Sequence, residues 1–136
     1  IINVMRKLRI IFALLPLLAF AACSGGGGPE VVAEKFIKAV YTADFEGAKQ
    51  YCTDETKQTI DFIAAFAAEK KDEMKKADVT IEQKSVVVAE DENSAEVTLI
   101  VHGSLDLDKG EVVDAKEEKL QVVKVDGKWL VDYKLK

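Results

Sequence analysis

The sequence predicts an α+β domain in which three N-terminal helices pack on one face of a curved four-stranded antiparallel sheet. Two observations support this fold class. From Pro29 to Lys76, apolar residues recur about every 3.6 positions, which is typical of amphipathic helices. After Ala77 they recur at every second position, in stretches separated by polar turn residues. Helices that precede the strands, rather than alternating with them, indicate segregated layers.

The first two helices follow from their end residues and apolar stripes. Pro29 suits the first turn of a helix over Pro29–Tyr41, because its missing N–H costs nothing there. The buried stripe of this helix is expected to contain Val32, Phe36, Ala39 and Val40. Asp44 predicts the N-cap of a second, short helix. That helix is expected to contain Phe45, Ala48, Tyr51 and Cys52.

The third predicted helix covers residues 54–76, with Thr53 as its N-cap. We expect its buried face to contain Ile60, Ile63, Ala67 and Met74, widened by Phe62 and Phe66. The last part of this helix is charged on nearly every side, and its lysines suit the negative end of the helix dipole. This charged end is interpreted as a solvated helix terminus.

Three of the four strands follow from alternation and turn residues. The first is expected over residues 79–88, and a change of apolar parity between Ile81 and Val88 predicts a bulge near Lys84. A second strand is expected over residues 95–103, after a turn at residues 91–94. The third, longer strand is expected from about residue 112 to residue 125, after a turn around Gly110.

The last hairpin is the clearest local signal in the chain. Asp126-Gly127, between two alternating stretches, predicts a two-residue turn that pairs Val125 with Lys128. This register places Lys124 opposite Trp129, Val122 opposite Val131 and Leu120 opposite Tyr133. The face expected to meet the helices carries Leu120, Val122, Trp129, Val131, Tyr133 and Leu135. A slip of one residue would expose Trp129 and bury Asp132, so the register is strongly specified.

Residues 1–22 are predicted to be a signal peptide. Arg6, Lys7 and Arg9 precede an apolar run over residues 10–22. This run is too short for a transmembrane helix, which needs about 20 residues, and small residues precede its end. Met5 is the first methionine, which allows residues 1–4 to lie upstream of the true start.

The segment Phe20-Ala21-Ala22-Cys23 resembles the lipobox of bacterial lipoproteins, although Phe20 replaces the usual leucine. The resemblance implies cleavage before Cys23, a diacylglyceryl thioether on its sulfur, and firm attachment to a membrane by acyl chains. Ser24 stands where an aspartate would favour the inner membrane. The expected location is therefore the outer membrane facing the periplasm in a Gram-negative source. In a Gram-positive source it is the outer face of the plasma membrane.

The glycines at residues 25–28 predict a flexible tether, so residues 23–28 hold the lipidated cysteine and the tether and residues 29–136 form the domain. Without the leader, 16 basic residues face 24 acidic ones, a net charge of −8. This charge disfavours nucleic acid as a partner and leaves anchoring to the acyl chains. Cys52 would then lack a disulfide partner and is interpreted as a small buried hydrophobe. With one histidine and no Cys-x-x-Cys motif, no metal or cofactor is expected.

The domain resembles the NTF2-like (cystatin-like) superfamily, and more narrowly the small bacterial lipoproteins of the DUF4878 type. The residues that carry the resemblance are Val32–Tyr41, the helix start at residues 43–48 and the closing hairpin at residues 123–131. The resemblance covers residues 29–136 and implies a cone-shaped fold that hosts both enzymes and binding modules. It implies no particular activity, because a fold does not determine a function.

Two non-enzymatic functions remain open from the sequence. In the first, a cavity between helices and sheet holds a small apolar or amphipathic ligand, lined by Phe36, Tyr41, Phe62, Phe66, Trp129 and Tyr133. In the second, the outer face of the sheet binds a second copy or another envelope protein through Ile100, Val123 and Leu130.

A ketosteroid-isomerase-like enzyme is a third, less favoured alternative. It needs a carboxylate base on the core face with tyrosine or protonated aspartate donors opposite. The residues considered for such a site are Tyr41, Tyr51, Tyr133, His102, Asp106 and Asp114. His102 belongs to the polar parity of its strand, and both aspartates lie near strand ends or turns. No catalytic residue is therefore assigned, and the chain is expected not to be an enzyme.

The first prediction concerns the anchor. Replacing Cys23 with serine removes the thiol that accepts the lipid, so the variant should move from the membrane fraction to the soluble fraction. Fractionation followed by immunoblotting measures this change. A Cys52→Ser variant, which keeps Cys23, is the control and should stay in the membrane. A Cys23→Ser variant that stayed in the membrane would contradict the lipoprotein interpretation.

Overall fold

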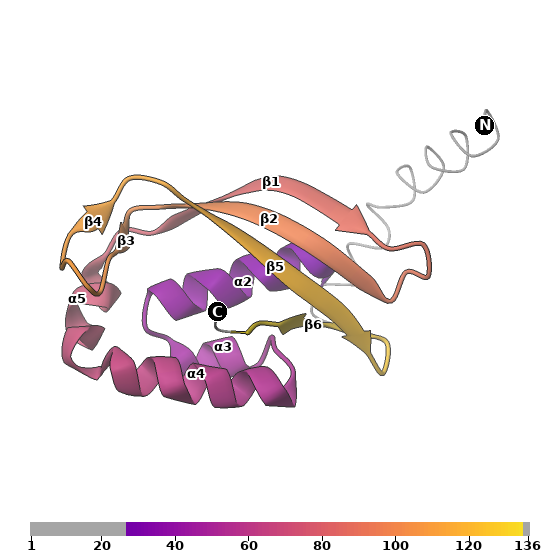
Figure 1. The fold of residues 1–136 in the computed structure, drawn as a ribbon, viewed down its shortest axis with the longest axis horizontal. Helices are drawn as coiled ribbons and strands as arrows, with labels where there is room; N and C mark the ends of the chain where they lie inside the picture. Colours follow the sequence, from indigo (N-terminus) through magenta and orange to yellow (C-terminus); the bar gives the residue numbers. More distant parts are fainter. Residues whose placement is uncertain (1–26, 135–136) are drawn as a thin grey trace.

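The structure is a computed structural model that describes residues 27–134. The predicted signal peptide, Cys23 and the first two glycines of the tether lie outside these residues, as does Leu135. The described chain forms helices first and strands afterwards (Figure 1). The helices are α2 (Pro29–Tyr41), α3 (Phe45–Lys49), α4 (Asp54–Phe66), the 3-10 turn η1 (Ala68–Lys70) and α5 (Lys71–Lys76). The strands are β1 (Thr80–Val88), β2 (Ser94–His102), β3 (Ser104–Leu105), β4 (Val112–Val113), β5 (Lys116–Val125) and β6 (Lys128–Asp132).

Four strands form one antiparallel sheet in the order β1-β2-β5-β6. Figure 1 shows the helices gathered on one side of this curved sheet, which we call its inner face. The predicted α+β class is therefore confirmed. Within residues 27–134, no helix has both the length and the apolar character needed to cross a membrane.

The helix starts agree with the capping residues in the sequence. Pro29 occupies the first turn of α2. The Asp44 carboxylate accepts a hydrogen bond from the Gly47 N–H at 3.0 Å, and the Thr53 hydroxyl accepts one from the Thr56 N–H at 3.3 Å. Each cap satisfies a backbone donor that lacks a partner inside its helix.

The predicted third helix is not continuous. Helix α4 ends at Phe66, Ala67 leaves the helical conformation, and α5 begins at Lys71. Helical stability in proteins depends mainly on packing of an apolar face. Beyond Ala67 the charged segment offers the core only Met74, which is buried in α5. The break lets α5 turn toward β3, so one continuous helix over residues 54–76 was a wrong prediction.

The short second helix is also shorter than predicted. It ends at Lys49, and Tyr51–Thr53 instead pairs in parallel with the outer edge of β6. The Val131 N–H donates to the Tyr51 carbonyl at 2.8 Å, and the Thr53 N–H donates to the Val131 carbonyl at 3.0 Å. These bonds supply partners to backbone groups of an edge strand that would otherwise be open.

The hydrophobic core lies between α2 and the inner face of the sheet. Helix α2 contributes Val32, Ala33, Phe36 and Ile37, all at most 2% exposed. The sheet contributes Val97, Leu99, Val101, Leu120, Val122 and Val131, all at most 1% exposed. Burying one such large side chain stabilises the fold by about 1.5–3 kcal/mol, so this layer is the main source of stability.

The predicted register of the last hairpin is confirmed within β6, which ends at Asp132, whereas the predicted pair of Leu120 and Tyr133 lies beyond the paired residues. In the last hairpin Val125 lies opposite Lys128, Lys124 opposite Trp129, and Val122 opposite Val131. The expected bulge is present in β1, where the register shifts between Gln83 and Ser85. The long strand expected over residues 112–125 is interrupted, however, and forms β4 and β5.

Gly103 interrupts the neighbouring strand as well, between β2 and β3. Its φ of 78° lies in the left-handed region, which glycine adopts without steric cost. A Cβ at this position would lie 2.5 Å from the Asp78 carbonyl oxygen. The bend separates the small β3–β4 ribbon from the main sheet. The chain returns to the main sheet at Lys116, the first residue of β5.

Gly103→Ala should destabilise the fold by about 2–3 kcal/mol, because it adds backbone strain and a clash with Asp78. Gly110→Ala is the matched control. Its φ of 69° is similar, but no atom lies within 4 Å of the added Cβ, so it should cost only about 1 kcal/mol. Urea unfolding followed by circular dichroism measures both free energies of unfolding. Equal losses in the two variants would show that the contact with Asp78 contributes nothing.

Candidate functional site

The six residues predicted to line a cavity separate into two groups. Phe36 belongs to the buried core, and Tyr41, Trp129 and Tyr133 are half-buried against it. The rings of Phe36 and Tyr133 lie 6.0 Å apart. Phe62 and Phe66 do not join them.

Phe62 and Phe66 are 63% and 65% exposed on α4, so their assignment to the interior was wrong. Helix α4 packs through Thr56 and Ile60, which are buried. A helix turns by roughly 100° per residue, so Phe62 and Phe66 lie about 120–160° away from Ile60 around the axis. The sequence interpretation widened the buried face too far.

The three residues predicted to form an interaction face lie on the outer side of the sheet and are half-buried. Val123 and Leu130 are paired across β5 and β6, but Ile100 lies opposite Glu117, six positions from Val123 along β5. Polar contacts lie on the same face. They include Lys84 Nζ to Glu117 Oε2 at 2.7 Å and Gln121 Nε2 to Glu96 Oε2 at 3.2 Å.

An open hollow of about 280 Å³ lies at the end of the sheet near the β1–β2 turn. Its lining residues are Val87, Ala89, Ser94, Ala95, Glu96 and Gln121. Val87, Glu96 and Gln121 have the parity of the outer face, because they share it with Thr98. The hollow is therefore distinct from the predicted cavity between helices and sheet.

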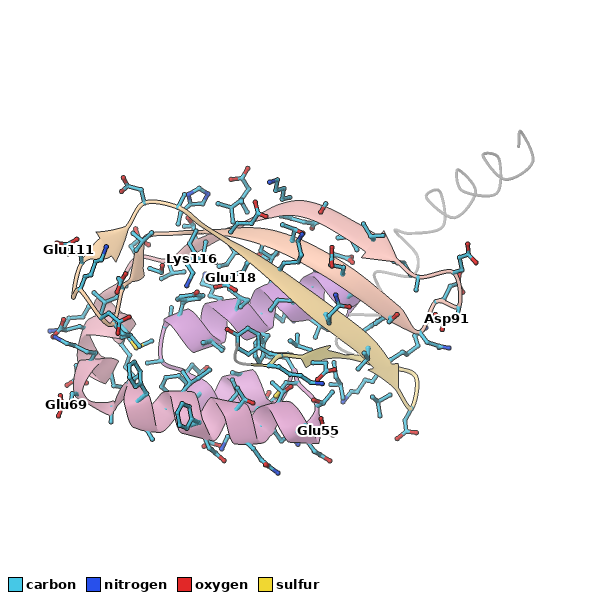
Figure 2. All side chains as sticks on the ribbon, viewed as in Figure 1. Glu55, Glu69, Asp91, Glu111, Lys116 and Glu118 are labelled. Carbon is cyan, nitrogen blue, oxygen red and sulfur yellow. The ribbon has the colours of Figure 1, made fainter. Side chains whose placement is uncertain are left out.

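A polar group lies on the inner face of the sheet, where the sequence predicted only apolar residues. Glu118 has the same parity as Leu120 and Val122, and its side chain is only 13% exposed. The Tyr41 hydroxyl, at the end of α2, donates a hydrogen bond to Glu118 Oε1. Figure 2 shows Glu118 and Lys116 side by side on β5, with their side chains directed toward the helices.

Lys116 completes this group from the sheet. Its Nζ lies 3.5 Å from Glu118 Oε1 and 5.6 Å from the centroid of the Tyr41 ring. The Lys116 side chain is 54% exposed, so the group reaches solvent on this side. We call Tyr41, Lys116, Glu118 and Tyr133 the inner-face cluster.

The environment keeps both tyrosines of the cluster protonated. Burial raises the pKa of Tyr41 far above its usual value of about 10, and the hydrogen bond to Glu118 raises it further. Burial also raises the pKa of Tyr133, with a smaller contribution from the charge of Glu118. At physiological pH both phenols are therefore neutral hydrogen-bond donors beside a carboxylate.

Sequence reasoning missed Glu118 and Lys116, although a signal was present. The alternation of β5 places both residues on the parity of Leu120. The acidic residues considered from the sequence, Asp106 and Asp114, lie near strand ends or turns. Asp106 caps a turn, where its Oδ1 accepts from the Asp108 and Lys109 N–H groups at 2.9 and 3.0 Å.

The other residues considered from the sequence lie away from the inner-face cluster. His102 is on the outer side of the sheet, with its Nε2 2.9 Å from Glu82 Oε1. Asp114 is exposed, and Tyr51 packs beside Lys35, whose Nζ is 5.9 Å from its ring centroid. Within residues 27–134, no group of three or more histidine, cysteine, aspartate or glutamate side chains is arranged to hold a metal ion.

Cys52 is buried, which confirms the sequence interpretation. Its thiol donates to the Lys49 carbonyl at 3.7 Å. Burial raises the pKa of this thiol to about 11, and the nearby ammonium groups of Lys57 and Lys49 only partly oppose the shift. The reactive thiolate is therefore scarce at neutral pH, and Cys52 has a packing role in this fold.

Comparison with known proteins supports the fold of this chain and no function. No protein-family model matches the chain, and no curated protein matches it. A solved structure from Campylobacter jejuni, described as a proposed NTF2-like transpeptidase, is similar at a TM-score of 0.56 and 23% identity. The similarity covers 79% of this chain and all of the other. At this identity the likeness concerns the fold alone, so this chain has an NTF2-like fold.

Alkaline pH should destabilise the protein through Tyr41. A folded-state pKa above the unfolded value means that the folded state holds the proton more tightly. The associated stability is complete below about pH 10 and is lost as the pH rises above it. Tyr41→Phe should cost about 1 kcal/mol at neutral pH and should flatten this alkaline decline.

Urea unfolding between about pH 8 and pH 11 measures both effects. The control is Tyr51→Phe, which removes a hydroxyl outside the inner-face cluster and should keep the wild-type dependence on pH. A Tyr41→Phe variant with an undiminished alkaline decline would contradict the assigned hydrogen bond.

Proposed function

We propose that this chain is a lipid-anchored cell-envelope protein whose NTF2-like domain is a non-enzymatic binding module. The inner-face cluster is its ligand site. The observation that carries the proposal is Glu118, a carboxylate that is 13% exposed on the apolar face of the sheet. A buried charge reduces stability unless it is paired, and stability alone does not call for one at this position.

The surroundings of Glu118 have the composition of a small-molecule site. Such sites combine mostly apolar and aromatic walls with a few polar groups at fixed positions. Here Tyr133 and the core residue Phe36 supply the aromatic part, while Tyr41 and Glu118 supply the polar part. The half-exposed Lys116 leaves the cluster open to solvent on one side.

The proposed location follows from the N-terminal segment. The basic start, the short apolar run and Cys23 support export and lipidation, and four glycines separate the lipidated residue from α2. The net charge of −8 beyond the leader gives no electrostatic attraction to anionic lipids. Acyl chains would therefore hold the domain at the periplasmic face of an outer membrane, or at the outer face of a Gram-positive plasma membrane.

The choice of binding over catalysis rests on how the cluster uses its polar groups. A ketosteroid-isomerase-like site keeps its base and its donors on opposite sides of the substrate. In the inner-face cluster the Tyr41 hydroxyl donates directly to Glu118, and Lys116 lies against the same carboxylate oxygen. The potential base, Glu118, and the potential donor, Tyr41, are thus hydrogen-bonded to each other, which favours recognition of a ligand over proton transfer.

Docking of a partner protein is a second candidate function, favoured by a separate observation. Phe62 and Phe66 lie one turn apart on α4 and are each about two-thirds exposed. Exposed aromatic side chains of this kind are enriched at protein–protein interfaces. This surface is on the far side of α4 from its buried residues Thr56 and Ile60.

Fragment screening by NMR distinguishes the two candidates. Full-length, isotope-labelled protein in detergent is titrated with a panel of cationic, neutral and anionic fragments. The largest shifts are expected at the backbone amides of Tyr41, Lys116 and Glu118. Glu118→Gln should weaken the response. Glu117→Gln is the matched control, because Glu117 is the next carboxylate on β5 but contacts Lys84 on the outer face.

Shifts concentrated at Phe62 and Phe66 would favour the docking function instead. A panel that leaves the amides of the inner-face cluster unmoved would contradict the proposed ligand site. The location is tested separately, by fractionation of the Cys23→Ser variant.

A further inference from the structure

We infer that the inner-face cluster is a binding site for organic ammonium ions, and that Lys116 occupies this site in the ligand-free protein. The inference rests on the proposed function and names the ligand class of the same site. It is carried by the position of one ammonium group, Lys116 Nζ, between a carboxylate and an aromatic ring.

The contacts of Lys116 define what the site recognises. Its Nζ lies 3.5 Å from Glu118 Oε1 and 5.6 Å from the centroid of the Tyr41 ring. A cation over an aromatic face is attracted by the ring quadrupole within about 6 Å, and a carboxylate adds a direct charge interaction. Together these two groups supply the two attractions, to a ring face and to a charge, that hold alkylammonium ligands. The Lys116 ammonium stands in for such a ligand.

The charge of the cluster favours a cation over an anion. Glu118 carries the negative charge, and its Oε1 already receives the Tyr41 hydroxyl. The only described cation in contact with this carboxylate is Lys116 itself. An anionic ligand would meet the charge of Glu118 in a setting that is largely shielded from water, which is unfavourable. A cation that replaces Lys116 keeps the charge of the cluster unchanged.

Displacement of Lys116 requires little rearrangement. Lys116 begins β5, and its side chain is 54% exposed, so its ammonium can return to water without moving the backbone. Ion pairs with an exposed partner are weak, because water screens the attraction and competes for the ammonium group. A tethered competitor of this kind acts at a local concentration in the millimolar range or above. Lys116 therefore weakens binding of a free ammonium ion to the same place.

The test measures binding of tetramethylammonium to full-length protein in detergent by NMR titration of backbone amides. Sodium chloride holds the ionic strength constant, and tert-butanol serves as a neutral probe of similar size and shape. In Lys116→Met the methylene stem is kept and the ammonium is lost, so affinity for tetramethylammonium should rise by about tenfold. Lys119→Met is the matched control, since Lys119 lies on the outer face of the same strand opposite Thr98, and its affinity should equal that of wild type.

A second substitution tests the two contacts themselves. Adding Glu118→Gln to Lys116→Met removes the carboxylate and should abolish the gain in affinity. If that double variant fails to show a folded amide spectrum, Lys116→Met with Tyr41→Leu removes the aromatic face instead. It should lose the gain as well.

The inference is overturned if Lys116→Met binds tetramethylammonium no more tightly than wild type. It is also overturned if tert-butanol binds as well as the cation, or if the gain survives loss of Glu118 or loss of the Tyr41 ring. Neutral or anionic fragments that still shift the amides of the inner-face cluster would leave the proposed ligand site intact. Failure of every fragment and of tetramethylammonium would overturn both.

Discussion

The packing of α2 against the inner face of the sheet is the contact on which the rest of the structure depends. Phe36 and Ile37 reach the centre of this layer, and each is at most 2% exposed. Since burial of such side chains is the main favourable term in folding, this contact fixes the height and angle of the helix over the strands. Tyr41 ends the same helix, so the packing of the core also places the Tyr41 hydroxyl against Glu118.

The chain supports this layer with a second constraint at the edge of the sheet. Tyr51–Thr53 pairs with Val131, and the Thr56 hydroxyl receives the Tyr133 N–H at 2.9 Å while donating to the Tyr133 carbonyl at 3.2 Å. An edge strand presents open backbone groups, and these bonds satisfy them within the molecule. They also hold the end of β6, and therefore Tyr133, beside Phe36. The inner-face cluster is thus positioned from the helix side and from the sheet edge at once.

Glu118 shows how a carboxylate is accommodated on an apolar surface. The Tyr41 hydroxyl satisfies one oxygen, and Lys116 balances the charge from the solvent side. Such an arrangement is stable, but it ties up a lysine that could otherwise remain in water. Glu118 and the Tyr41 ring would contact an ammonium ligand in place of Lys116, so the ligand-free and the proposed liganded states share one geometry. The exposed pair Phe62 and Phe66 lies on another element and does not take part in this arrangement.

The sequence by itself determined the order of helices and strands, the caps at Asp44 and Thr53, and the registers around Asp126-Gly127 and the bulge in β1. These features follow from periodicity and turn chemistry, which act over a few residues. The alternation of β5 also places Glu118 on the same face as Leu120, a signal that is present in the sequence. Only the tertiary structure decided that Tyr41 meets Glu118, 77 positions away, that the helix after Ala67 breaks, and that Phe62 and Phe66 face solvent. Local patterns state which residues share a face of one element. Which faces meet depends on how the whole core closes around α2.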